Sequence, residues 1–301
     1  MKRFFRLRCL VLLIVAVWLL ADAPDVRTAM QSALSLCGRT VIPALFPFLT
    51  VSSLLIASGF GEWAEPLFSS LMTSLFRLPG CAGSAMALGL MGGYPVGAAT
   101  AAQLYRRGAL TRDEAQRLLA FCNNSNPAFF LSVLGGIFGS VRTGLWLWLI
   151  HLCGALLTGL LFRGKDLPHS TPSAPSSAAP PLPLPILFVR AVKEAAANMV
   201  SVCGFVSVFY VIVALFPFAG GRYGTAAAAF LELFSLTSRL CPDRFHLILA
   251  SAATGWGGVS VLCQTAAILD GTDLHVSLAG KAVHGLLCAL LSTLLCGYIL
   301  T

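Results

Sequence analysis

The most informative shortage in this 301-residue sequence is of charge. Charged residues make up only 11% of the chain, and Asp and Glu together number 12, whereas a soluble domain carries about 25% charged residues. Hydrophobic residues make up 57%, and the mean hydropathy is +0.84. These values exclude an ordinary soluble domain. The net charge is +8, but the basic residues lie at the ends of apolar segments, as in membrane topology signals. We therefore expect no nucleic-acid partner.

Cysteine is plentiful, yet the spacings that would give it a structural or metal-binding role are lacking. No two cysteines form a CxxC pair, and most lie in apolar segments, where cysteine behaves as a small hydrophobe. The ten are Cys9, Cys37, Cys81, Cys122, Cys153, Cys203, Cys241, Cys263, Cys288 and Cys296. The five histidines (His151, His169, His246, His275 and His284) show no ligand spacing either. We expect no metal site, no cofactor, no disulfide framework and, in the absence of a triad or phosphate loop, no catalytic residues and no enzyme.

What the sequence has is a succession of apolar stretches from end to end. Each is about 20 residues long, the length needed to cross a bilayer as a helix. Backbone polar groups in lipid must be paired internally, and strands of a barrel would be about half as long. The sequence therefore predicts an all-α, polytopic helical membrane protein.

Breaks between the stretches divide the chain into four parts. Residues 1–22 form a predicted amino-terminal transmembrane helix with a cytoplasmic amino end, because Pro24 follows the AxA-like site Ala21–Ala23 and argues against cleavage as a signal peptide. Residues 164–187 are a linker rich in Pro, Ser and Ala. Residues 23–163 and 188–301 are then two halves on either side of it.

In the first half, residues 25–38 are predicted to be an amphipathic segment, followed by a span at 40–58 that Pro43 and Pro47 could kink. Thr111 followed by Glu114 predicts a capping box at the start of a helix.

The two halves resemble one another. At a shift of about 165 residues Gly92-Gly93 aligns with Gly257-Gly258, and Cys37-Gly38 aligns with Cys203-Gly204. If residues 80–105 form a re-entrant hairpin, the basic stretch 106–117 stays inside, as the positive-inside tendency requires. The two repeats are then inverted, an arrangement typical of secondary transporters. A full span at 80–105 is the alternative.

Three breaks within apolar segments are the candidate substrate pathway, because irregular backbone at membrane depth is tolerated where it lines a cavity or is buried in protein. The first contains Gly92, Gly93, Tyr94, Pro95 and Gly97; the second contains Asn123, Asn124, Ser125 and Asn126; the third contains Gly255, Trp256, Gly257 and Gly258, with Ser260 and Gln264 following. The alternatives are a packing kink for the first, a surface loop with Asn126 as a helix cap for the second, and an interfacial belt position for Trp256.

Two ionisable residues stand alone in apolar segments. Glu232 and Lys281 could couple transport to ions or protons, or could reach a membrane surface. A polar but uncharged ligand suits the amides of the second break.

Particular runs of the sequence resemble a known family. They are LFPFLTVSSLL (45–55), FRLPG (76–80), GGYPVGA (92–98), LTRDEAQRLLAFCNNSNPAF (110–129) and GWGGVSV (255–261), and they are similar to the YlbJ-type sporulation integral membrane proteins of the nucleoside recognition, or Gate, domain family. The resemblance implies a bacterial cell-membrane protein linked to spore cortex formation. Gate domains also occur in nucleoside and ferrous iron transporters. The run NNSNP departs from the expected NNSGP, and scarce acids argue against an iron route.

We therefore expect a transporter-like or permease-like protein for an unidentified small polar molecule, with membrane lipid as its surroundings. The alternative is a non-transporting scaffold in spore morphogenesis. The substrate and the oligomeric state are not indicated. If Asn123, Asn124 and Ser260 converge on one cavity, transport is favoured; if they face separate surfaces, the scaffold is favoured.

Overall fold

The computed structural model describes residues 2–165, 183–215 and 221–299, and in these ranges it contains helices and no strand. Most of the predicted linker lies outside the described residues. The α-helices are α1 (Lys2–Ala21), α2 (Ala23–Leu36), α3 (Ile42–Ala57), α4 (Phe60–Leu71), α5 (Ala82–Gly92), α6 (Val96–Arg106), α7 (Arg112–Leu118), α8 (Gly135–Ile137), α9 (Val141–Leu161), α10 (Leu184–Leu215), α11 (Gly221–Leu231), α12 (Leu233–Thr237), α13 (Arg244–Trp256), α14 (Gly258–Leu269) and α15 (Leu278–Ile299). Three π-helical turns, η1 (Cys37–Val41), η2 (Met72–Phe76) and η3 (Phe129–Leu134), join some of them.

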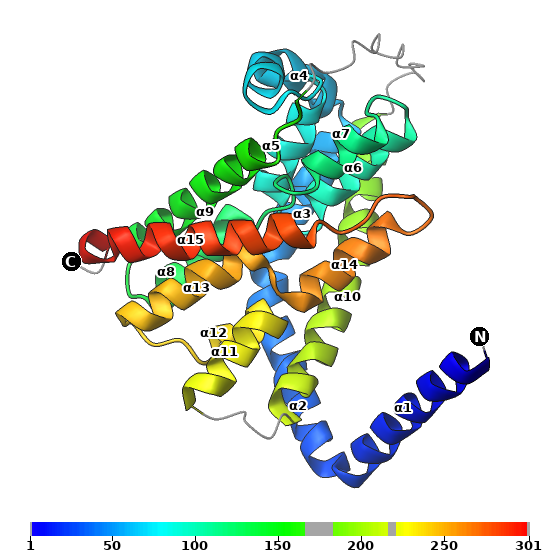
Figure 1. The fold of residues 1–301 in the computed structure, drawn as a ribbon, viewed down its shortest axis with the longest axis vertical. Coiled ribbons are helices and arrows are strands. Elements are labelled where there is room, and N and C mark those ends of the chain that lie inside the picture. The colour runs from blue at the N-terminus through cyan, green and yellow to red at the C-terminus, as the bar shows by residue number, and fades with distance from the viewer. Residues whose placement is uncertain (1, 166–182, 216–220, 300–301) are drawn as a thin grey trace.

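Within the described ranges, five helical segments are long and apolar enough to cross a membrane. They are Ala23–Leu55, Val141–Leu161, Leu184–Leu215, Arg244–Leu269 and Leu278–Ile299. Their length and composition confirm the predicted polytopic, all-helical class. The amino-terminal helix α1 meets the start of α2 and diverges from the other helices (Figure 1). Many of its apolar side chains are exposed, Leu12 at 68% and Leu20 at 76% among them.

The first long helix differs from the prediction. Residues 25–38 were expected to be an amphipathic segment separate from the span at 40–58, but α2, η1 and α3 form one helical rod. Pro47 lies inside α3, and the π-helical turn η1 joins α2 to α3 without a loop. A wider turn of this kind keeps a helix continuous where the regular ladder is interrupted.

Helices of the two halves pack against one another. α3 and α2 pack along α10, and α9 packs along α15. The Sγ of Cys37 lies 3.9 Å from the carbonyl oxygen of Cys203, its partner in the sequence alignment. Such contacts accord with a pseudo-twofold relation between the halves, and the inverted repeat itself stays a prediction.

Helices α5 and α6 form a tight hairpin. Gly89 and Gly97 face one another, since a Cβ added at Gly89 would lie 3.0 Å from the Cα of Gly97. A Cβ at either glycine would also overlap the carbonyl oxygen of Cys122. Both helices are 11 residues long, or about 16 Å, too short to cross a bilayer singly. Residues 82–106 therefore form a hairpin whose two ends lie together, with Cys81 beside Ala109, and the re-entrant topology stays a prediction.

The end where this hairpin begins and finishes is basic. Thr111 and Glu114 make the predicted capping box at the start of α7. The Arg112 guanidinium pairs with Asp273 at 3.0 Å, Arg117 donates to the carbonyl of Phe76, and Arg163 donates to that of Ser74. These bonds bring α7, the loop before α15, η2 and the end of α9 together. The positive-inside tendency predicts that this end faces the cytoplasm.

The hairpin gives a topology that labelling can test. Arg107, beside the hairpin, and Arg142, at the start of α9, are both exposed and lie at opposite ends of the bundle. We expect Arg107→Cys to react with a membrane-impermeant maleimide only in inside-out vesicles, and Arg142→Cys only in right-side-out vesicles. The parent protein, with its native cysteines, is the control. Labelling of both positions from one side would contradict the hairpin.

Candidate functional site

The three predicted breaks meet inside the bundle, and Tyr94 is where the first meets the third. The Tyr94 hydroxyl donates a hydrogen bond of 2.8 Å to the carbonyl of Thr254 near the end of α13. Its ring lies against the turn between α13 and α14, because a Cβ added at Gly257 would be 3.4 Å from the ring. Gly257 and Gly258 have φ of 88° and 85°, which favours glycine at both positions. The two helix breaks therefore stack on each other through one tyrosine.

Lys281 joins this pair to the second break. Its Nζ donates to the carbonyl of Asn123 at 2.7 Å and to the hydroxyl of Tyr94 at 3.1 Å. The ammonium group also lies 4.6 Å from the centre of the Tyr94 ring, within cation–π range. The residue is 3% exposed. A buried cation held by a carbonyl and a phenol, rather than by a carboxylate, is costly in an apolar interior.

The second break, residues 123–126, is non-helical and fully enclosed. Asn123, Asn124, Ser125 and Asn126 are each at most 4% exposed. Asn126 Oδ1 accepts from the backbone N–H of Phe129, so the predicted helix cap is present, at depth rather than at a surface. The Nδ2 of Asn123 donates to the hydroxyl of Thr265 on α14 at 2.9 Å, and the Nδ2 of Asn124 donates to the carbonyl of Phe121.

Each of these amides still has one end without a partner. Asn123 Oδ1, Asn124 Oδ1 and Asn126 Nδ2 are buried and make no hydrogen bond. A buried polar atom left unpaired costs about 1–3 kcal/mol. The second break therefore offers two acceptors and one donor within a few residues of sequence.

A small cavity lies beside these groups. Its free volume is about 30 Å³, which is room for about one water and far below the roughly 300 Å³ of a small-molecule site. It is lined by Leu45, Gly92, Gly93, Tyr94, Ser125, Asn126, Phe129, Val202, Val206, Glu232, Leu233, Phe234, Val261 and Gln264. Residues of the first two breaks, together with Gln264 after the third, thus share one cavity, and the described conformation is closed around it.

Glu232 is the acid of this cavity. It is 1% exposed, and its carboxylate accepts hydrogen bonds from the backbone N–H groups of Phe234 and Ser235 as the N-cap of α12. The residue therefore neither snorkels to a membrane surface nor lies mid-helix, as the sequence had left open. It interrupts the apolar segment between α11 and α12 and presents a carboxylate to the cavity.

Several predicted pathway residues have packing roles instead. Trp256 stacks on Phe230 at 5.3 Å, and its Nε1 donates to the Phe230 carbonyl, so it does not face the cavity. Gly255 lies against Gly285 of α15. Ser260 accepts from Gln264, one helical turn along α14. Pro95 follows Tyr94 in a cis peptide and precedes α6, and Gly97 contacts Cys122.

The test set for transport was whether Asn123, Asn124 and Ser260 converge on one cavity. Residues near them in the sequence line the cavity instead. Asn123, Asn124 and Ser260 do not line the cavity, whereas Ser125, Asn126 and Gln264 do. Asn123 and Asn124 do not face separate surfaces either, since both are buried in the same loop. Neither outcome of the test occurs as stated, and transport and scaffold both stay proposals.

Sequence spacing missed a second polar cluster. His151, His284 and Cys288 offer ligand atoms that all lie within 4.8 Å of one another, and all three residues are buried. They come from α9 and α15, 133 or more positions apart, so no local motif could indicate them. The sequence showed no ligand spacing for these three residues, and the expectation of no metal site stays untested by their proximity.

Comparison with known proteins agrees with the motifs. Residues 39–143 match the family model for nucleoside recognition, the Gate domain. The chain is 29% identical to the sporulation integral membrane protein YlbJ of Bacillus subtilis (strain 168), over 82% of this chain and 71% of that protein. No solved structure matches the chain. The matches confirm the resemblance drawn from the sequence, and the matched region contains the first two breaks.

Proposed function

We propose that this multi-pass membrane protein, which is similar to YlbJ and carries a Gate match, moves a small polar molecule through the cavity between its helix breaks. The observation that supports the proposal most directly is the convergence of the first two breaks and Gln264 on one buried cavity, with amide groups left unpaired beside it. The proposal places the chain in a bacterial cell membrane with its amino end in the cytoplasm. By likeness to YlbJ it acts in sporulation, at the formation of the spore cortex, and without catalysis.

The unpaired amides indicate what the site recognises. Amide oxygens and nitrogens can pair with a neutral ligand that has both donors and acceptors. Asn126 lies beside the cavity, and its Nδ2 is unpaired. A ligand that accepts a hydrogen bond from Nδ2 removes the free-energy cost of burying this atom without a partner. The pathway residues proposed are those that line the cavity or hold its lining: Gly92, Gly93, Tyr94, Ser125, Asn126, Gln264, Asn123 and Asn124.

The small volume means that transport needs a change of shape. The closed cavity of about 30 Å³ holds no molecule larger than about one water. Broken helices that hinge at Gly93 and Gly257 could open it, because one repeat rocks against the other in many transporters. Glu232 beside the cavity and Lys281 behind Tyr94 are the groups proposed to couple this motion to an ion or proton.

A matched pair of substitutions at Asn126 tests the recognition role. Asn126→Ser keeps a neutral helix cap, since serine and asparagine cap equally well, but removes the unpaired Nδ2. We expect this variant to reach wild-type membrane levels and yet fail to restore spore heat resistance in a deletion strain. Asn126→Ala removes the cap as well and should lose about 1 kcal/mol of stability.

Heat resistance restored fully by Asn126→Ser would remove the amide from the pathway. The scaffold alternative has its own support, because small residues pack closely between helices, as Gly280 does on Ala120. It predicts that Asn123→Ala and Asn124→Ala both complement whenever they accumulate. The transport proposal predicts that both accumulate and fail.

A further inference from the structure

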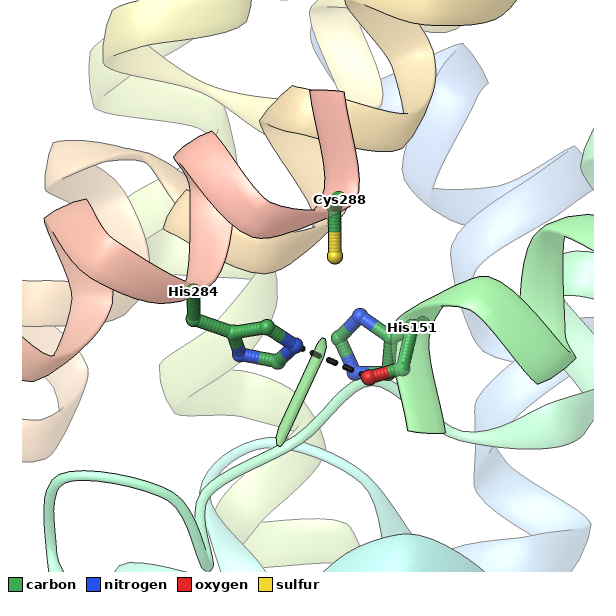
Figure 2. Close-up of side chains that lie close together, drawn as sticks. All are labelled: His151, His284 and Cys288. Carbon is green, nitrogen blue, oxygen red and sulfur yellow. Dashed lines mark hydrogen bonds between the residues drawn. The ribbon is translucent and has the colours of Figure 1, made fainter. Parts of the chain in front are cut away.

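The cluster of His151, His284 and Cys288 lies between α9 and α15, apart from the residues that line the cavity. Each of the three is 0% exposed, and Figure 2 shows the two imidazole rings and the sulfur turned toward a common centre. The rings are 4.5 Å apart between centroids. Gly154 leaves room for the cluster, since a Cβ there would be 2.9 Å from the Cys288 sulfur and 3.0 Å from the His284 ring.

Hydrogen bonds fix one nitrogen of each ring and leave the other unpaired. The Nε2 of His284 donates to the His151 carbonyl at 2.9 Å (Figure 2), and the Nε2 of His151 accepts from the Ser125 N–H at 3.2 Å. Both Nδ1 atoms are buried without a partner. Two unpaired ring nitrogens in an apolar interior are unfavourable, so the cluster carries ligand capacity that the chain itself does not use.

We propose that His151, His284 and Cys288 form a binding site for monovalent copper. Two imidazoles and one thiolate in a trigonal set, without a carboxylate, suit a soft metal, and copper favours such sets. Charge decides between the soft candidates. Cu(I) with one thiolate is neutral, whereas Zn(II) would leave a net positive charge in an apolar interior. Lys281, which is buried one helical turn before His284 on α15, disfavours a second positive charge there.

Loading the site involves protons but no electrons. Copper stays Cu(I), the Cys288 thiol releases one proton as the Cu–S bond forms, and each imidazole supplies a lone pair. Metal–ligand bonds of about 2.0–2.3 Å place ligand atoms about 3.5–4 Å apart, so the cluster contracts by about 1 Å. A lone pair of His284 becomes available at Nε2 when its proton moves to the unpaired Nδ1, which exchanges the bond to the His151 carbonyl for a bond to copper.

The site is also linked to the cavity. Ser125 lines the cavity, and its N–H bonds to His151, so the copper cluster lies one hydrogen bond away. If His151 binds copper through Nδ1, its proton moves to Nε2 and the bond from Ser125 is lost. Copper should then loosen the second break.

The test measures Cu(I) binding by the purified full-length protein in nanodiscs, without oxygen, against a competing Cu(I) chelator. We expect one copper per chain, bound about tenfold more tightly for each unit rise in pH as one proton is released. Cys288→Ser and His284→Gln should weaken binding by about 100-fold. Cys153→Ser, which alters an exposed cysteine of α9, the helix that carries His151, should bind like the wild type.

X-ray absorption of the copper-loaded protein should show one sulfur and two nitrogens, and size-exclusion profiles should show that each variant is folded. Affinity unchanged in Cys288→Ser would overturn the proposal, as would affinity lost in Cys153→Ser. Tighter binding of Zn(II) than of Cu(I) in the same competition would overturn the assignment to copper.

Discussion

Lys281→Met is expected to fold as well as the wild-type protein and to abolish function. The substitution removes a buried ammonium group whose partners are the Asn123 carbonyl and the Tyr94 hydroxyl, and replaces it with an apolar side chain of similar length. Exchanging a buried charge for a well-packed apolar group is often neutral or stabilising. The Tyr94 hydroxyl keeps its bond to Thr254. A charge that stability does not require points to a role in the pathway.

The measurement pairs thermal unfolding in detergent with spore heat resistance in a complemented deletion strain. We expect the midpoint of unfolding to stay within a few degrees of the wild-type value while heat resistance falls to the level of the deletion strain. Lys193→Met on α10 is the matched control. A large fall in the midpoint for Lys281→Met would make the residue structural, and full heat resistance would remove it from the mechanism.

Gly97→Ala is expected to prevent the hairpin from forming. A Cβ at this position would overlap the Cys122 carbonyl and lie 3.0 Å from the Cα of Asn123. Both obstacles are backbone atoms, which cannot move aside without displacing the second break. Overpacking of a dense core costs about 1–3 kcal/mol and more when the backbone must shift, so we expect a loss at the upper end of that range and little protein in the membrane.

Gly204→Ala is the control for this substitution, because nothing lies within 4 Å of a Cβ at that position. It should accumulate normally, since alanine is the better helix former. Immunoblots of membranes and unfolding in detergent compare the two variants. Equal accumulation of both would show that the α5–α6 hairpin does not pack against Cys122 as described.

Local signals in the sequence were enough for much of the fold. Hydropathy predicted the apolar helices, Thr111 and Glu114 predicted the capping box, and glycine and asparagine runs predicted where helices break. Continuity of α2 with α3 was missed, because Arg27 and Arg39 suggested a separate amphipathic segment, whereas the π-helical turn η1 joins it to α3. The amino-acid composition does not indicate where a π-helical turn forms.

Individual residues of the candidate site could be predicted only where a polar side chain interrupts an apolar segment of the sequence. Lys281 and Glu232 were noticed for that reason, but their partners depend on how distant helices pack. Trp256 shows the converse, because a large aromatic next to a break suggested a ligand and proved to stack on Phe230. The cluster of His151, His284 and Cys288 depends entirely on the packing of α9 against α15.

The central claim, that a closed cavity between the helix breaks opens to water, is tested most directly at Val206. This residue lines the cavity, whereas Val208 on the same helix is 54% exposed on the apolar outside. Each is replaced by cysteine and treated with a charged, membrane-impermeant thiosulfonate in inside-out and right-side-out vesicles, with the parent protein as background. The account predicts that Val206→Cys is modified from both sides and Val208→Cys from neither. A Val206→Cys protein that reacts only after denaturation would contradict it.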